Sequence, residues 1–238
     1  MQKILSYMRK AIDNYNMIEE GDKIAVGLSG GKDSTTMLMG LKNLQRFYPK
    51  KFEIIAITIN PGFEGFDIVL LKDICRKIDV PLIIEDGHMK EIVFDIRNEK
   101  NPCSLCANLR RGMLNSIAAR EGCTKIAIGH NEDDVLETFI MNLFYAGSIN
   151  TFAPISYMDR SKMTLIRPLI YAPEKYIRNF VKRNNITIMP KACPMDGFSK
   201  REDIKELLKN LQTVIPHIRA NLYGAIKRGE VNGFKEFK

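Results

Sequence analysis

The sequence predicts a doubly wound α/β fold, in which helices cover both faces of a mainly parallel β-sheet. Two observations support this fold class. Apolar stretches of strand length alternate with stretches whose apolar residues recur at helical spacing, and the alternation runs through most of the 238 residues. The segment 52–59 is almost continuously apolar, as a strand buried on both faces of a parallel sheet has to be.

The predicted elements follow one another in a regular order. Residues 2–20 are expected to form a helix, because Ile4, Met8 and Ile12 recur at helical spacing before Gly21. A short apolar strand at 23–28 then leads into a helix through the periodic apolar positions of 37–44. The later elements are a strand at 52–59, a helix at 66–78, a strand at 82–84, a helix at 104–120, a strand at 125–128, a strand at 165–170, a helix at 173–183 and one or two basic helices between 200 and 228.

The domain organisation follows from the length and from the distribution of charge. We expect an N-terminal helix in 1–20, one α/β domain in 21–195 and a basic helical region in 196–238. Residues 1–150 hold 19 Lys and Arg against 20 Asp and Glu, whereas residues 151–238 hold 17 against 8. A polyanion would find most of its contacts in the last third of the chain, although a solvated basic surface explains the same charge.

The cysteines and the hydropathy indicate a cytosolic protein. No run approaches the roughly 18 consecutive apolar residues that cross a bilayer, and residues 1–5 do not resemble a signal peptide, so we expect no membrane association. The cysteine count is odd in a chain without export features, which argues against disulfides and in favour of metal or redox chemistry. The five cysteines are Cys75, Cys103, Cys106, Cys123 and Cys193.

A phosphate-binding motif lies between the first predicted strand and the helix that follows it. This phosphate loop comprises residues 29–34 and reads Ser29-Gly30-Gly31-Lys32-Asp33-Ser34. The glycines let the backbone approach an anion, and the N-terminus of the helix faces it. Lys32 adds a cation, while Ser29 and Ser34 add hydroxyl donors. The sequence therefore predicts an ATP site in this loop.

Acidic residues at two strand ends indicate how the phosphates would be handled. The phosphate loop is not a Walker A loop, because Asp33 follows the lysine, and a carboxylate beside phosphates implies a bound Mg²⁺. A second motif, 129–134, follows another strand and should reach the same crevice. Asp133 or Asp134 would complete the Mg²⁺ site or orient the substrate, although both are also ordinary helix-capping residues. His130 is explained equally well as a group of the site and as a structural hydrogen-bonding group.

Three of the cysteines are candidate metal ligands. Cys103 and Cys106 have the two-residue gap that lets both sulfur atoms bind one centre, which alone is compatible with zinc, an iron–sulfur cluster or a redox pair. Cys193 is a single further thiol, and three thiolates leave a four-iron cluster with one free iron, whereas structural zinc usually takes four protein ligands. Cys75 and Cys123 are better explained as small buried residues, with Cys123 as an alternative third ligand.

In combination, these motifs resemble the tRNA 2-thiocytidine synthetase family of N-type, or PP-loop, ATP pyrophosphatases. The similarity extends from Lys23 to Pro194 and includes the phosphate loop, the motif 129–134, the CxxC followed by Leu-Arg-Arg-Gly, and the isolated Cys-Pro. The chain is shorter than the typical bacterial member, and it lacks the paired zinc-binding CxxC modules of the related tRNA 2-thiouridine enzymes, which favours the cytidine branch.

The resemblance implies a set of cofactors and partners. It implies a cytosolic homodimer, ATP bound by the phosphate loop with Gly129 and Asp134, and an oxygen-sensitive [4Fe-4S] cluster on Cys103, Cys106 and Cys193. The implied reaction adenylates the C2 oxygen of cytidine 32 in a tRNA anticodon loop and replaces it with sulfur from a desulfurase-derived persulfide or from sulfide. We expect Lys32, Asp33, Asp134 and Arg110 to take part in catalysis, and the candidate tRNA contacts are Arg111, Lys205, Lys209, Arg219, Lys227 and Arg228.

Other functions remain compatible with the motifs. A PP-loop tRNA ligase of the lysidine synthetase type would need no cluster, and a tRNA 2-thiouridine synthase would share most of the site. A regulatory ATP-binding module with structural zinc would show no ATP turnover. An iron–sulfur enzyme that acts on a free nucleobase would show no salt-dependent affinity for tRNA.

Overall fold

A six-stranded sheet lies at the centre of the computed structural model, which describes residues 1–97, 102–190, 193 and 200–237. The strand order is β3-β2-β1-β4-β6-β5, and neighbouring strands run parallel except for β5, which is antiparallel to β6. The strands are β1 (Asp22–Gly27), β2 (Phe52–Asn60), β3 (Leu82–Asp86), β4 (Lys125–Ala127), β5 (Ile155–Met158) and β6 (Met163–Ile166). The mainly parallel sheet confirms the predicted fold class.

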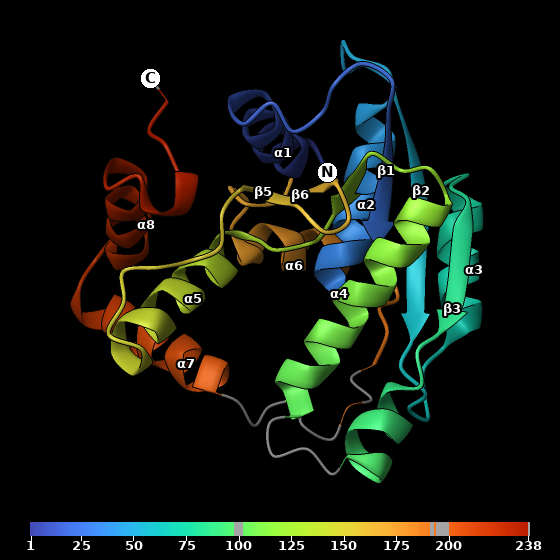
Figure 1. Cartoon of the computed structure of the whole chain (residues 1–238). Helices are drawn as coiled ribbons and strands as arrows, with labels where there is room; N and C mark the ends of the chain where they lie inside the picture. The colour runs from blue at the N-terminus through green and yellow to red at the C-terminus, as the bar shows by residue number, and fades with distance from the viewer. Residues whose placement is uncertain (98–101, 191–192, 194–199, 238) are drawn as a thin grey trace.

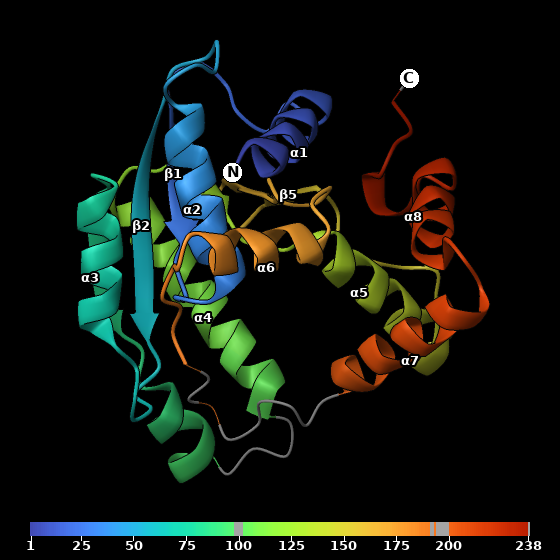
Figure 2. The same cartoon turned by 180° about the vertical axis from the view of Figure 1, so that it is seen from behind.

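Helices cover both faces of this sheet, as Figures 1 and 2 show from opposite sides. The helices are α1 (Gln2–Asn14), α2 (Lys32–Leu44), α3 (Ile68–Lys77), α4 (Pro102–Arg120), α5 (Glu132–Tyr145), α6 (Glu174–Arg183), α7 (Lys200–Val214) and α8 (Ile218–Arg228). Two short segments, a π-helix η1 (Glu91–Ile96) and a 3₁₀ helix η2 (Val231–Gly233), complete the described elements.

Alternating side chains of the central strands divide the core into two clusters. In β1, Ile24 and Val26 belong to the larger cluster, which includes residues of α1, α2 and α6, whereas Ala25 points to the opposite face and joins the smaller cluster. Ile117 and Ala118 of α4 cover that smaller cluster. Because successive side chains of a strand point to opposite faces, a strand between two helical layers must be apolar throughout.

The C-terminal helices belong to the larger cluster. Ile204 and Leu208 of α7 and Ile226 of α8 are buried in it, and both helices lie beside α5 (Figures 1 and 2). The hydroxyl of Tyr223 in α8 donates a 2.7 Å hydrogen bond to the carbonyl oxygen of Ile170. The predicted boundary between residues 195 and 196 lies outside the described residues. In the part of the chain that the structure describes, no helix has the length and hydropathy to cross a membrane.

Four local predictions differ from the structure. The first helix ends at Asn14 instead of residue 20, and Met17 in the following connection is buried in the core. The strand expected over 165–170 ends at Ile166, because the chain turns sharply there: the amide of Ile170 donates to the carbonyl oxygen of Arg167. Helix α5 and the antiparallel strand β5 were not among the predicted elements.

Candidate active site

The phosphate loop connects the end of β1 to the first turn of α2. The Ser34 hydroxyl donates to the carbonyl oxygen of Gly31 at 3.1 Å, and it lies 3.0 Å from the Ser29 hydroxyl. Because the one hydroxyl proton of Ser34 is directed to Gly31, the Ser29 hydroxyl is the donor of that second bond. Two serine hydroxyl groups and the free amides at the start of α2 therefore gather where an anion would bind.

Two glycines allow close backbone contacts with this loop. Gly30 has φ +77°, and a Cβ at this position would lie 2.8 Å from the Cβ of Met189, whose amide donates to the Gly30 carbonyl oxygen at 2.8 Å. A Cβ at Gly129 would lie 3.0 Å from the amide nitrogen of Ser34. Gly129 therefore serves at least to let the chain after β4 approach the first turn of α2.

Lys32 lies between two carboxylates. Its Nζ is 2.7 Å from Asp33 Oδ2 and 2.9 Å from Glu174 Oε1. Burial disfavours the charged amine, but Asp33 and Glu174 outweigh it and raise the pKa of Lys32. Burial likewise opposes ionisation of Glu174, yet Lys32, Lys205 and Arg178 lower its pKa to about 2. Glu174, at the start of α6, was not among the candidates, since nothing in its local spacing links it to the loop.

The motif 129–134 forms the N-terminus of α5. Asn131 is the N-cap: its side chain accepts from the amide of Asp134 at 3.2 Å, while Asp134 Oδ2 accepts from the amide of Asn131 at 2.9 Å. This capping box also reaches the phosphate loop, because Asn131 Nδ2 donates to Asp33 Oδ1 at 3.0 Å. Asp134 thus caps the helix and lines the same cavity as Asp33, and burial raises its pKa.

Asp133, the residue before Asp134, makes its side-chain contacts with α6 and α8. Asp133 forms an ion pair with Arg219 of α8, and its Oδ2 accepts from the amide of Glu174 at 2.7 Å. Arg201 of α7 lies 3.4 Å from Asp134 Oδ1. Of the two candidate carboxylates, Asp134 is the one that lines the cavity beside the loop.

A cavity of about 870 Å³ brings the phosphate loop and the three candidate thiols together. The loop and Asp134 form part of its lining, the ends of β2 and β4 another, and Cys103, Cys106, Arg110 and Arg111 of α4 a third. Cys193 lines the same cavity. Such a cavity lies beyond the carboxyl ends of the strands, where open α/β sheets bind their ligands.

The three candidate thiols line one cavity. Burial raises the pKa of the Cys106 thiol, Arg110 lowers it, and Cys193 and Cys103 raise it again. Their side chains are not in a ligating arrangement, since no group of three or more His, Cys, Asp or Glu within the described ranges is placed to hold a metal ion. Cys75 and Cys123 are buried in the two core clusters, and neither lines this cavity.

His130 lines the cavity and makes structural contacts there. Burial and then the charges of Arg167 and Arg201 lower its pKa to about 3. Its ring stacks on Phe152 with centroids 4.6 Å apart, and its Nδ1 accepts from Arg167 Nε at 3.2 Å. His130 is therefore neutral at physiological pH, with its proton on Nε2.

The candidate tRNA contacts occupy different surroundings. Arg111 is exposed on α4 at the cavity, and Lys209 and Arg228 are exposed on α7 and α8. Lys205 lies 3.5 Å from Glu174, and Arg219 is committed to its ion pair with Asp133. Lys227 lies over the ring of Tyr223.

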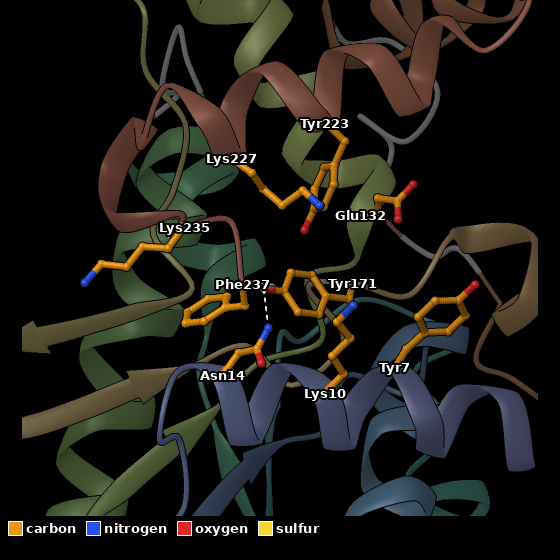
Figure 3. Close-up of a pocket in the computed structure, with 9 residues that line it drawn as sticks. All are labelled: Tyr7, Lys10, Asn14, Glu132, Tyr171, Tyr223, Lys227, Lys235 and Phe237. Carbon is orange, nitrogen blue, oxygen red and sulfur yellow. Dashed lines mark hydrogen bonds between the residues drawn. The ribbon is translucent and has the colours of Figure 1, made fainter.

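A second, smaller pocket of about 160 Å³ contains Lys227 and is separate from the phosphate loop. Figure 3 shows that it lies between α1 and α8, with Tyr7 and Lys10 on one side and Tyr223 and Lys227 on the other. Glu132, the first residue of α5, also lines it, and burial raises the pKa of this carboxyl to about 7.

Comparisons with known proteins agree with the site. A family model described as a PP-loop domain matches residues 2–210. Two curated proteins named tRNA-cytidine(32) 2-sulfurtransferase are each 38% identical to the chain: that of Syntrophotalea carbinolica over 94% of this chain and 88% of its own length, and that of Geotalea uraniireducens over 94% and 90%.

Solved structures show the same architecture. The U34-tRNA thiolase NcsA from Methanococcus maripaludis with its [4Fe-4S] cluster aligns with a TM-score of 0.79 at 26% identity, over 95% of this chain and 78% of that one. The NH3-dependent NAD synthetase from Campylobacter jejuni shares the fold, with a TM-score of 0.52 at 16% identity over 100% and 97% of the two chains. The chain belongs to the PP-loop family, in the group of the tRNA-cytidine(32) 2-sulfurtransferases.

Proposed function

We propose that this protein is an ATP-dependent tRNA sulfurtransferase that converts cytidine 32 of the anticodon loop to 2-thiocytidine. The observation that supports it best is the single cavity lined by the phosphate loop and by Cys103, Cys106 and Cys193. An adenylating ligase would need the first feature alone. The activity and the nucleotide are those in the names of the relatives that cover most of the chain.

The phosphate loop would bind ATP and promote adenylation. The C2 oxygen of the base attacks the α-phosphorus, and pyrophosphate leaves with the electron pair of the broken P–O bond. Lys32 places its ammonium group in the loop, and Glu174 holds it charged there. Asp33 and Asp134 would hold Mg²⁺, which neutralises charge on the departing pyrophosphate.

The thiol side of the cavity would supply sulfur to the activated carbon. Cys103, Cys106 and Cys193 would hold a [4Fe-4S] cluster, which would supply an open coordination position for a sulfide. Attack by sulfur at C2 breaks the bond to the adenylate oxygen and releases AMP. Arg110 lines the same cavity as the thiols and the loop, and its guanidinium would stabilise the negative charge of the adenylate.

The remaining partners are part of the same proposal. Arg111, Lys209 and Arg228 are exposed cations that can contact RNA phosphates, with Lys205 and Lys227 next to them on α7 and α8. Arg219 contributes less, because Asp133 already neutralises it. A persulfide or sulfide donor, a homodimer and a cytoplasmic location complete the assignment.

One anaerobic preparation tests both halves of this function. The unmodified protein should hold about four irons and four acid-labile sulfides per chain, and Cys193→Ala should lose them. Cys75→Ala, which changes a cysteine outside the cavity, is the matched control and should retain them. With ATP, sulfide and unmodified tRNA, nucleoside mass spectrometry should then detect 2-thiocytidine. Zinc or no metal in the unmodified protein, or thiolation of a uridine instead, would contradict the proposal.

A further inference from the structure

Arg167 is an unusual buried side chain in the wall of the cavity. It follows β6 directly and is 6% exposed. Its Nη1 donates to the carbonyl oxygen of Ala153 at 2.5 Å and to the Ser156 hydroxyl at 3.2 Å, and its Nε donates to His130 Nδ1 at 3.2 Å. The guanidinium lies 5.0 Å from the centre of the Phe152 ring. These contacts hold the group rigidly beside the cavity that it lines.

None of these partners carries a negative charge. The other buried Asp, Glu and Lys side chains of the described residues each have an opposite charge nearby: Lys125 lies 2.8 Å from Asp22, Glu174 lies 2.9 Å from Lys32, and Glu137 lies 3.5 Å from Arg201. Within the same residues, no carboxylate lies within 4.0 Å of Arg167. An uncompensated buried charge destabilises a fold strongly, and an anion bound in the cavity would compensate the charge of Arg167.

The two described carboxylates that line the cavity do not supply this anion. Asp33 is paired with Lys32, and Asp134 with Arg201. Arg110 and Arg111 of α4 line the same space and add positive charge. Burial and the charge of Arg111 lower the pKa of Arg167 to about 10, which still leaves it protonated at neutral pH. This side of the cavity is therefore cationic.

The position of Arg167 in the sheet distinguishes its ligand from the phosphates of ATP. In the sheet, β4 lies between β1, which leads into the phosphate loop, and β6, which leads into Arg167. Two strand spacings separate the backbones of β1 and β6 by roughly 10 Å. The loop has its own donors for ATP, so an anion at Arg167 belongs to the molecule that approaches the nucleotide from the β6 side.

We propose that Arg167 binds a backbone phosphate of the RNA substrate next to the nucleotide that is modified. The inference rests on the proposed function, since it assumes that RNA enters this cavity. Nε and Nη1 donate to the protein, whereas Nη2 makes no hydrogen bond to a described residue, so its two N–H groups can donate to a phosphate. His130 acts as a positioning residue that holds the guanidinium through its Nε.

The test compares two arginines of one β-hairpin. Arg167→Met removes the buried cation at one end of β6, and Arg160→Met removes an exposed cation from the turn at the other end. Binding of labelled tRNA is measured by fluorescence anisotropy over a range of salt concentrations, and binding of ATP without RNA by calorimetry. We expect Arg167→Met to weaken tRNA binding about tenfold, to reduce the slope of log K against log salt by about 0.7–0.9, and to leave ATP affinity unchanged.

Arg160→Met should bind tRNA as the unmodified protein does. An unchanged tRNA affinity in Arg167→Met would overturn the inference, and so would a loss of ATP affinity, which would assign the guanidinium to a nucleotide phosphate. If Arg167→Met does not melt cooperatively, Arg167→Gln, which keeps an amide donor for the Ala153 carbonyl oxygen, must give the same loss of tRNA affinity. Failure of the unmodified protein to bind tRNA would instead refute the proposed function together with this inference.

Discussion

Glu132 should make the fold less stable as the pH rises. Its carboxylate lines the small pocket of Figure 3, and within the described residues it forms no ion pair or side-chain hydrogen bond. Burial and the neighbouring Asp133 raise its pKa to about 7, against the opposing charges of Arg219, Lys227 and Lys175. We therefore expect Glu132→Gln, which cannot ionise, to stabilise the protein in alkaline solution.

The magnitude follows from the two pKa values of Glu132. A carboxyl whose pKa is about 4.5 in the unfolded chain and about 7 in the fold binds more protons when folded, so the free energy of unfolding falls as the pH rises through this window. At about 1.4 kcal/mol per pKa unit, the upper limit of the loss is about 3 kcal/mol. Glutamine also forfeits the favourable charge at the start of α5, about 0.3–1 kcal/mol. The expected net gain of Glu132→Gln at pH 8 is about 1–2 kcal/mol.

Urea unfolding followed by circular dichroism at pH 5 and pH 8 measures this difference. At pH 5 the two proteins should be nearly equal in stability, and at pH 8 the variant should be more stable. Because Glu137, whose pKa is also about 7, contributes equally to both, only the difference between the two proteins is informative. Glu230→Gln changes an exposed glutamate of the same region and should have no effect at either pH. A variant that is less stable than the unmodified protein at pH 8 would refute the reasoning.

Two further substitutions probe the phosphate loop. Gly129→Ala should destabilise the protein by about 1–3 kcal/mol, because the new methyl group meets backbone atoms of Asp33 and Ser34. The same contact should weaken ATP binding, as measured by calorimetry. An unchanged ATP affinity would contradict this prediction. Glu174→Gln should lower the free energy of unfolding at pH 7 by about 1–3 kcal/mol, as measured by urea unfolding. Because the pKa of Glu174 is about 2 in the fold, this difference in stability should shrink as the pH falls from about 4.5 towards 2. A deficit that is the same at pH 3 and pH 7 would show that the charge of Glu174 is not the cause.

The sheet and the phosphate loop could be predicted because their signals are local. An apolar strand, two glycines and a helix start lie within 15 residues of one another at 22–36, and the structure has them in that order. Strand β5 gives no such signal, since it has four residues, lies at the sheet edge and is nowhere fully buried. In α5, the apolar residues Leu143, Phe144 and Tyr145 are exposed, which obscures the helical pattern of burial.

The rest of the site depends on pairs that are distant in sequence. Glu174 meets Lys32 across more than 140 positions, and the significance of Arg167 is that no carboxylate of the described residues lies beside it, which the sequence does not show. One further contact had a readable local signature: Asn131 followed three residues later by Asp134 is a capping-box pattern. That pattern would have predicted the start of α5 and the capping contact of Asp134.

Several cations of the basic C-terminal third form ion pairs within the protein and are therefore not all available to a polyanion. Arg201 and Arg219 pair with Asp134 and Asp133, and Lys205 lies beside Glu174, so these cations neutralise carboxylates around the phosphate loop. Without them, the acidic start of α5 would repel a triphosphate bound nearby. The positive charge left for RNA is therefore smaller than the net charge of residues 151–238, and the tRNA affinity should depend more on the cations of the cavity wall, Arg110, Arg111 and Arg167, than on those of α7 and α8.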